Sequence, residues 1–258
     1  MTPGETEKIA DIGSSQPDLD ASTDRYANRF RGKSGEWLLS RQTAAVRKLL
    51  KDDQGANVLD VGGGHGQIAA PLLADGHAVT VHASSEAALA QVQRLDHPAL
   101  TLSSGPLMPL PFAERSFDIV TSFRIMAHIG DWRRFLAELA RVARRAVIVD
   151  FPIPSGANAL EPLLFGLKKR IEGDTRRFDT IRKADARRSL KEAGFPHATE
   201  IGQFVLPIVV HRKLGMPGVS SVLEKACGGV GLASALGTPV ILRANRADAE
   251  PDTVRRRV

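Results

Sequence analysis

Short apolar runs rich in β-branched residues alternate along the chain with segments in which apolar residues recur every three or four positions. The first pattern predicts strands and the second predicts helices. Strands that alternate with helices form right-handed βαβ units, so we expect an α/β fold with a mostly parallel sheet and helices on both faces. The predicted strands are 57–61, 77–83, 99–104, 117–123, 145–151, 198–210 and 238–245. The predicted helices are 36–52, 67–76, 86–95, 131–145 and 184–195, with Asp131 as the N-cap of the fourth.

The ends of the chain and two internal segments depart from this alternation. Residues 1–24 are polar and lack apolar periodicity, so we expect a disordered tail, followed by a single domain over residues 25–247. Residues 248–258 are expected to form a flexible basic tail. Residues 152–182 and 207–237 mix apolar stretches with basic residues, and we expect helical insertions there.

Composition narrows the class of protein. The chain has 258 residues, of which 43% are hydrophobic and 25% charged, and this excludes disorder of the whole chain. A single cysteine, Cys227, excludes an internal disulfide, and seven scattered histidines predict no metal site. No apolar run approaches the ~20 residues of a membrane span, and the first residues lack the features of a signal peptide. We therefore expect a cytoplasmic protein.

The net charge of +6 is unevenly distributed. Residues 1–150 carry 17 Lys and Arg against 18 Asp and Glu, whereas residues 151–258 carry 18 against 11. This excess in the second part of the chain indicates an anionic partner: an acidic substrate, nucleic acid or a membrane surface. A solvated basic face is the simpler alternative.

The string VLDVGGGHG, residues 58–66, lies between a predicted strand and a predicted helix. Its glycines allow a sharp turn and a close approach of the backbone to a ligand, which indicates a nucleotide-type site. Gly64, Gly66 and Ala69 satisfy a dinucleotide fingerprint. Asp60 favours a different ligand, because a carboxylate at the end of the strand suits the ammonium group of an amino-acid-bearing cofactor.

Three linked blocks, residues 58–66, 105–123 and 128–142, resemble class I S-adenosylmethionine-dependent methyltransferases of the small-molecule type. The resemblance covers residues 36–200 approximately. It implies a Rossmann-like, doubly wound sheet of about seven strands with the last strand antiparallel, and helical insertions that form a substrate lid. It also implies S-adenosylmethionine as cofactor and S-adenosylhomocysteine as product.

The resemblance further implies which residues bind the cofactor. The glycine loop is expected to surround the methionine part, residues 107 and 108 the adenine, residues 83 and 84 the ribose, and residues 122 and 123 the sulfonium. Core packing is the alternative for Leu107, Met108 and Phe123. The predicted cofactor residues are Asp60, Gly62, Gly63, Gly64, Gly66, Ala83, Ser84, Leu107, Met108, Ser122 and Phe123.

The chain departs from the family pattern at two positions. Ala83 stands where the family commonly has an acidic residue for the ribose hydroxyls, and Pro106 where it often has an Asp for the adenine amino group. The lost contacts would cost about 1 to 3 kcal/mol each unless other groups compensate. His82, Ser84, Ser85 and Glu86 are candidates for the ribose, with helix capping or surface exposure as the alternative.

Acceptor binding is expected at the carboxyl ends of the strands, where the two insertions leave the sheet. Their composition favours an apolar substrate with an anionic group, and their basic residues also allow contact with an anionic membrane surface. His128 is the candidate general base, with a structural histidine as the alternative. Candidate substrate residues are Tyr26, Arg124, Arg176 and His211.

The favoured function is methylation of an oxygen or carbon atom in a small or lipid-like acceptor. The string TSFRI, residues 121–125, differs from the Asn/Asp-Pro-Pro-aromatic motif of many DNA and amide methyltransferases, so DNA is not expected as a partner. RNA is disfavoured because only 5% of residues are aromatic. A cofactor-binding protein with little or no transfer activity is the first alternative, and an NAD(P)-dependent oxidoreductase or an RNA methyltransferase ranks lower.

Overall fold

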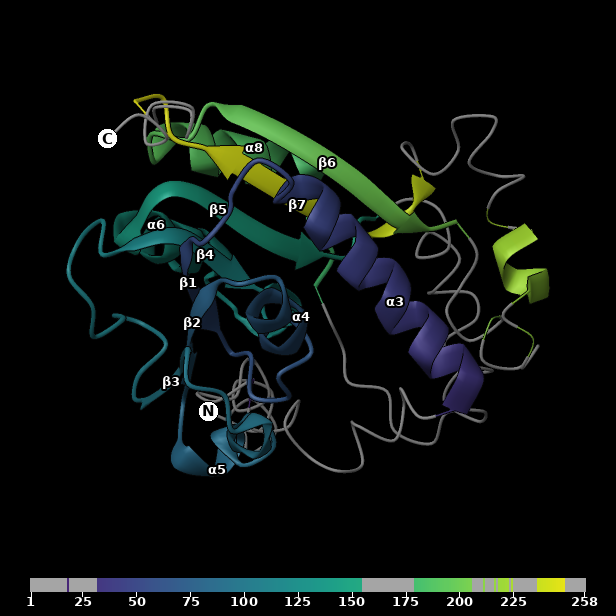
Figure 1. The fold of residues 1–258 in the computed structure, drawn as a ribbon. Helices are drawn as coiled ribbons and strands as arrows, with labels where there is room; N and C mark the ends of the chain where they lie inside the picture. The colour runs from purple at the N-terminus through teal and green to yellow at the C-terminus, as the bar shows by residue number, and fades with distance from the viewer. Residues whose placement is uncertain are drawn as a thin grey trace, which may run out of the picture.

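The computed structural model describes residues 18, 32–154, 179–205, 211, 216, 218–222, 224 and 236–248. Within them one seven-stranded sheet consists of β1 (Asn57–Val61), β2 (Ala78–Ala83), β3 (Leu100–Ser104), β4 (Phe117–Ser122), β5 (Ala143–Phe151), β6 (His197–Phe204) and β7 (Thr238–Asn245). Its strand order is β3-β2-β1-β4-β5-β7-β6 (Figure 1). The five strands from β3 to β5 are parallel, and β7 runs antiparallel to both β5 and β6. The predicted doubly wound sheet with an antiparallel last strand is confirmed.

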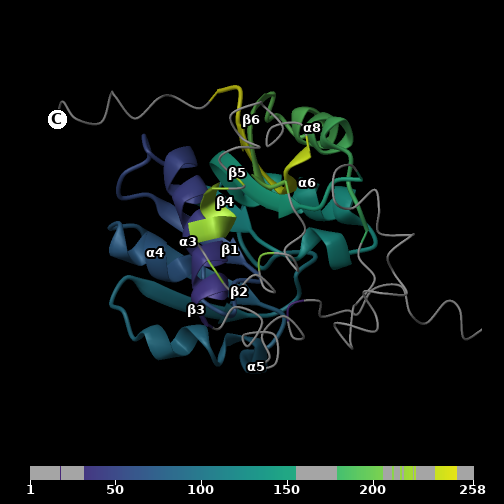
Figure 2. The same cartoon turned by 90° about the vertical axis from the view of Figure 1, so that its right-hand side faces the viewer.

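Alternating strand residues build a separate core on each face of the sheet. Val58, Ile119 and Ile148 pack against the helices α3 (Gly32–Leu49) and α4 (Ala69–Ala74). Leu59 and Val120 belong to the core of the other face, together with α6 (Trp132–Val142) and α8 (Lys183–Glu192). Figure 2 shows α3 and α4 on one side of the strands and α6 and α8 on the other. The apolar runs are continuous because both faces are buried.

The helix α6 begins as predicted but ends earlier. Asp131 Oδ1 accepts a hydrogen bond from the backbone N–H of Arg134 at 3.1 Å, which confirms the N-cap. The prediction of helix up to residue 145 is wrong, because β5 already begins at Ala143. In the strand, Arg144 pairs with Asp118, and Arg145 Nη2 lies 3.2 Å from Asp53 Oδ1. The pairing of β5 with β4, which includes Ala143 opposite Phe117, thus begins where the helix ends.

The predicted helix 86–95 is divided into α5 (Glu86–Leu89) and the 3₁₀ helix η2 (Val92–Leu95). Between them the chain turns so that Val92 donates its backbone N–H to Gly64 O at 2.9 Å. Val92 is fully buried. A tertiary contact with the glycine loop therefore interrupts a segment that is helical by periodicity.

Several predictions concern parts of the chain outside the described residues. The two tails and most of the insertions 152–182 and 207–237 lie there. Among the described residues, no helix has the length and apolar character that crossing a membrane requires.

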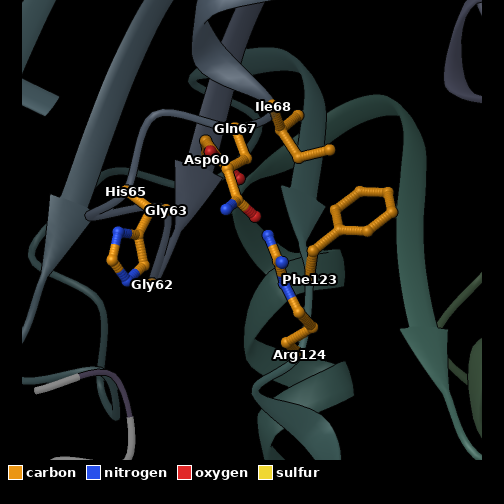
Figure 3. A pocket seen from close by; sticks show the side chains of 8 residues that line it. All are labelled: Asp60, Gly62, Gly63, His65, Gln67, Ile68, Phe123 and Arg124. Carbon is orange, nitrogen blue, oxygen red and sulfur yellow. The ribbon is translucent and has the colours of Figure 1, made fainter. Parts of the chain in front are cut away.

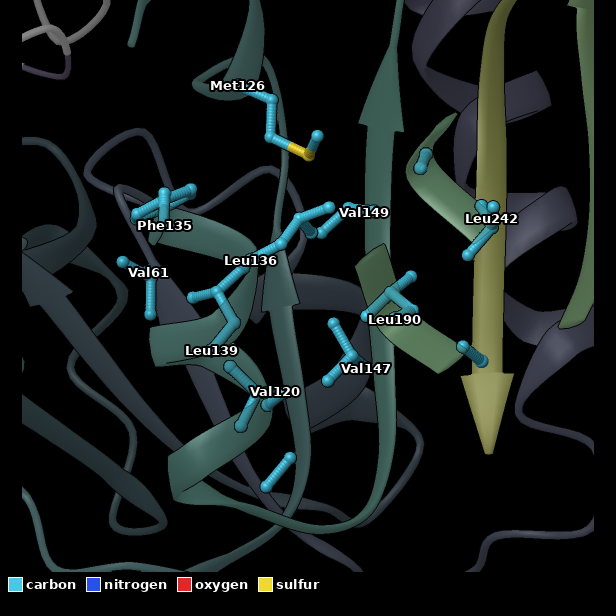
Figure 4. Packing of buried hydrophobic residues seen from close by; sticks show 14 of the residues in the cluster. Val61, Val120, Met126, Phe135, Leu136, Leu139, Val147, Val149, Leu190 and Leu242 are labelled. Atoms are coloured by element: carbon cyan, nitrogen blue, oxygen red, sulfur yellow. The ribbon is translucent and has the colours of Figure 1, made fainter. Parts of the chain in front are cut away.

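Leu139 offers a test of the packing between α6 and the sheet, because it is fully buried in the core shown in Figure 4. We expect Leu139→Ala to lower the free energy of unfolding by about 2 to 5 kcal/mol, through lost burial and the cavity left behind. Arg134→Ala, on the exposed side of the same helix, is the control and is expected to change it by no more than about 0.5 kcal/mol. Urea denaturation measures both, and equal effects would contradict this packing.

Candidate functional site

A small hollow opens at the carboxyl ends of β1 and β4. This is the edge of an open parallel sheet at which ligands are expected. Figure 3 shows the side chains around it. The lining residues are Asp60, Gly62, Gly63, His65, Gln67, Ile68, Phe123 and Arg124.

Asp60 is the chemically decisive residue of this hollow. Its side chain is fully buried, and Oδ1 accepts a hydrogen bond from Thr121 Oγ1 at 2.8 Å. Oδ2 is buried without a hydrogen-bond partner in the described part of the chain. Burial raises the pKa of Asp60 to about 6, against the opposing effects of the Thr121 hydrogen bond and the positive charge of Arg124. A buried carboxylate oxygen without a partner is a site for a cationic donor.

The glycine loop is shaped by its contact with Asp60. A Cβ atom on residue 63 would lie 1.9 Å from Asp60 Oδ2, so only glycine fits there. Gly62 has φ +77°, and a Cβ atom on it would lie 2.6 Å from Ile125 Cγ1. The backbone N–H of Gly62 donates to His82 O at 2.7 Å, which joins the loop to the end of β2.

Arg124 lies between two buried carboxyl groups. Its φ of 63° is left-handed, and its backbone N–H donates to Asp150 Oδ1 at 2.5 Å. The Arg124 side chain points toward Gln67 and Asp60 (Figure 3). Burial raises the pKa of Asp150 to about 6 as well, and the hydrogen bond and the charge of Arg124 again oppose this rise. Arg124 thus supplies positive charge to both carboxyl groups.

The other predicted cofactor residues differ in their placement. Phe123 lines the hollow, but Ser122 Oγ donates to Val61 O at 3.0 Å inside the sheet. Leu107 is buried in the core of the α6 face, and Met108 packs against that core. Ala83 is fully buried at the end of β2.

His82 is a structural residue rather than an exposed ribose ligand. It is fully buried, with Nδ1 3.0 Å from Ser103 Oγ and Nε2 3.1 Å from Pro106 O. Burial lowers its pKa, so the neutral ring is favoured. In this form His82 holds the loop that carries Pro106 and Leu107 against β2.

The predicted catalytic and substrate residues are not gathered at the hollow, apart from Arg124. His128 lies half-buried in the 3₁₀ helix η3 (Met126–His128), and it is not among the lining residues. His211 is fully buried, with Nε2 2.9 Å from Glu224 Oε1. Tyr26 and Arg176 lie outside the described residues, and in the described part no cluster of three or more potential metal ligands occurs.

Sequence reasoning missed several residues of the site. His65, Gln67 and Ile68 follow directly from the glycine loop, so their place in that loop was an available signal. The sequence signal for Thr121 and Asp150 was weaker, because each is only a polar residue near the end of an apolar strand. Their contacts with residues 60 and 124 depend on strand order.

Comparison with known proteins agrees with this geometry. Residues 59–149 match the model of the methyltransferase domain family. This part of the chain therefore resembles a methyltransferase domain. Curated relatives of the chain are named as S-adenosylmethionine-dependent methyltransferases. The Asp60 oxygen without a partner among the described residues, together with the adjoining glycines, fits the ammonium group of that cofactor.

Among curated proteins, the chain is similar to a demethylmenaquinone methyltransferase from Renibacterium salmoninarum, with 29% identity over 154 residues, 55% of this chain and 65% of that protein. It is also similar to a probable S-adenosylmethionine-dependent methyltransferase from Mycobacterium tuberculosis, with 28% identity over 115 residues, 45% of this chain and 42% of that protein. The chain thus spans less than two thirds of the length of each.

Solved structures share the fold. The magnesium protoporphyrin IX methyltransferase from Synechocystis PCC 6803, with bound S-adenosylhomocysteine, has a TM-score of 0.60 and 18% identity, over 93% of this chain and all of that one. A structure named as a cyclase has a TM-score of 0.53 and 19% identity over 80% of each chain. The fold therefore does not by itself determine the reaction.

Because Gly63 lies so close to Asp60, we expect a methyl group added at residue 63 to weaken cofactor binding strongly. Gly63→Ala is expected to displace the Asp60 carboxyl group and to weaken S-adenosylhomocysteine binding about 100-fold or more, measured by calorimetric titration. Gly218→Ala is the control, because nothing lies within 4 Å of the added Cβ atom. Unchanged affinity of Gly63→Ala would show that the site is misplaced.

The raised pKa of Asp60 predicts pH-dependent cofactor affinity. An ammonium group binds the ionised carboxylate, so affinity is expected to fall as the pH falls through about 6. At pH 5 about one tenth of the carboxylate is ionised, which makes binding of S-adenosylhomocysteine roughly tenfold weaker than at pH 7.5. Asp150 titrates in the same range, so Asp60→Asn is the control, and the part of the pH dependence that this substitution removes is assigned to Asp60. A flat wild-type profile would contradict the contact.

Proposed function

We propose that this protein transfers the methyl group of S-adenosylmethionine to an oxygen or carbon atom of a small or lipid-like acceptor. The observation that carries the proposal is the buried Asp60 Oδ2, which has no hydrogen-bond partner among the described residues and lies at the ligand edge of the sheet. A bare buried carboxylate oxygen is costly to the fold, and a cationic ligand offsets that cost.

Several residues of the hollow have a defined task in this proposal. Asp60 binds the ammonium group of the cofactor, and the glycine loop lets the methionine part approach the backbone. The cofactor supplies a methyl group on a positively charged sulfur atom. Transfer is an in-line displacement, so positioning of the acceptor and exclusion of water contribute most to the rate. Phe123 and Ile68 give the hollow an apolar wall that excludes water.

The apolar character of the acceptor has two supports. Phe123 and Ile68 line the hollow beside the cationic Arg124, which suits an apolar molecule with an electron-rich or anionic oxygen. A curated relative is named as a demethylmenaquinone methyltransferase, and another, from Pyrenophora dematioidea, as an O-methyltransferase. We therefore propose a phenol or quinol-like acceptor whose oxygen is oriented by Arg124.

His128 is proposed as the group that removes a proton from the acceptor. It follows β4 by a few residues and lies in η3, at the same end of the sheet as Phe123 and Arg124. Imidazole titrates near neutral pH, which suits this task.

The second candidate is a protein that binds the cofactor without transferring its methyl group. The fold similarity to a structure named as a cyclase and the apolar Ala83 at the end of β2 favour it. Turnover of the cofactor separates the two candidates.

The experiment begins with calorimetric titration of S-adenosylhomocysteine and, in parallel, of NAD. We expect a micromolar dissociation constant, about −8 kcal/mol, for the first and no binding of the second. Methyl transfer from labelled S-adenosylmethionine is then measured with a naphthoquinol, a catechol and a bulk RNA, and incorporation is expected with the first two. Binding without incorporation into any acceptor would support the second candidate.

The role of His128 is tested in the same assay. His128→Ala is expected to lower kcat by about 10²- to 10⁴-fold while the affinity for S-adenosylhomocysteine stays within about twofold. His97→Ala, at an exposed histidine, is the control. Equal kcat values for wild type and His128→Ala would remove His128 from the mechanism.

A further inference from the structure

Asp18 reaches the ligand edge of the sheet from a distant part of the chain. Its side chain is fully buried, and Oδ2 accepts a hydrogen bond from the backbone N–H of Ser84 at 2.7 Å. The two residues are 66 positions apart in the sequence. Burying a carboxylate is costly, so a carboxylate held at this place calls for a function.

The position of Asp18 is next to the glycine loop. A Cβ atom on Gly62 would lie 3.6 Å from Asp18 Cβ, and Gly62 in turn donates its backbone N–H to His82 O. Asp18 therefore lies between the turn that follows β1 and the turn that follows β2. Asp60 lies on the β1 side of this position.

The turn after β2 carries two further polar groups. The hydroxyl oxygens of Ser84 and Ser85 are buried and have no hydrogen-bond partner in the described part of the chain. Ser85 is the N-cap residue of α5, but its side chain makes no capping hydrogen bond. The interpretation of these serines as helix caps is therefore not supported. Ala83, the last residue of β2, contributes only a methyl group.

The proposed binding mode arranges the parts of the cofactor along the edge of the sheet. Asp60 receives the ammonium group, and the loop of Pro106 and Leu107, held by His82, lies on the far side of β2. The ribose lies between the methionine part and the adenine, and hence over the turns after β1 and β2. Two adjacent hydroxyl groups donate well to one carboxylate, because each of its oxygens accepts a hydrogen bond.

We propose that Asp18, together with the hydroxyl group of Ser84, binds the ribose hydroxyls of the cofactor. This inference rests on the proposed function and adds a residue to its site. In this proposal Asp18 supplies the carboxylate for the ribose hydroxyls, because β2 ends at Ala83, which has none. Because Asp18 is buried against Gly62 and Ser84, the ribose reaches it only when this contact opens.

The test compares two probes on the full-length chain: S-adenosylhomocysteine and its analogue that lacks both ribose hydroxyls. Asp18→Asn keeps an oxygen for the Ser84 N–H but removes the charge. We expect it to weaken S-adenosylhomocysteine binding about 10- to 100-fold, while binding of the dideoxy analogue changes by no more than about twofold. Ser84→Ala is expected to weaken S-adenosylhomocysteine binding by a smaller factor. Asp52→Asn, at an exposed carboxylate, is the control and is expected to change neither affinity.

The possible negative results distinguish failure of the ribose contact from failure of the proposed function. Equal weakening of both probes by Asp18→Asn would give Asp18 a structural role only, and tighter binding would show that its carboxylate occupies the ribose position. Either result overturns the ribose contact and leaves the proposed function standing. If wild type does not bind S-adenosylhomocysteine, the proposed function fails, and the ribose site fails with it.

Discussion

The buried carboxyl group of Asp60 is the constraint on which the rest of the site depends. It lies at the end of a central strand, where water does not reach it, and Thr121 of the neighbouring strand satisfies one of its oxygens. The other oxygen fills the space where residue 63 would carry a Cβ atom. The glycine loop is therefore shaped by a polar group of the protein as well as by the ligand, because a side chain at residue 63 and the Asp60 carboxylate compete for the same volume.

The positive charge of Arg124 partly offsets the negative charge of two buried carboxyl groups at this edge of the sheet. Asp60 and Asp150 are both fully inside the protein, and burial raises the pKa of each to about 6. Arg124 lowers the cost of both charges, and the hydrogen bond from its backbone to Asp150 holds it in a left-handed conformation. The Asp60 carboxylate is thereby oriented in advance for the ammonium group of a cationic ligand.

Residues that are far apart in the sequence contact one another at the carboxyl ends of the parallel strands. Asp18 meets Ser84, Val92 meets Gly64, and His82 meets Pro106, in each case through a hydrogen bond that includes a backbone group. Parallel strands make this convergence inevitable, because their carboxyl ends lie at one edge while the intervening helices return the chain to the other. Loops can therefore vary in sequence while the edge keeps its place relative to Asp60.

The sequence by itself determined the class of fold, most element positions and the residue on which the site depends. Period-two and period-3.6 patterns are local properties, so β1 and β7 were predicted within their observed bounds, and Asp60 stood out as a charge among buried apolar residues. The tertiary structure alone decided that helix 86–95 is interrupted, that Arg144 and Arg145 lie in a strand, and that Asp18, Thr121 and Asp150 belong to the site. Each of these depends on a partner far away along the chain. Periodicity carries no information about such a partner, because strand order and the approach of distant segments are set by packing of the whole domain.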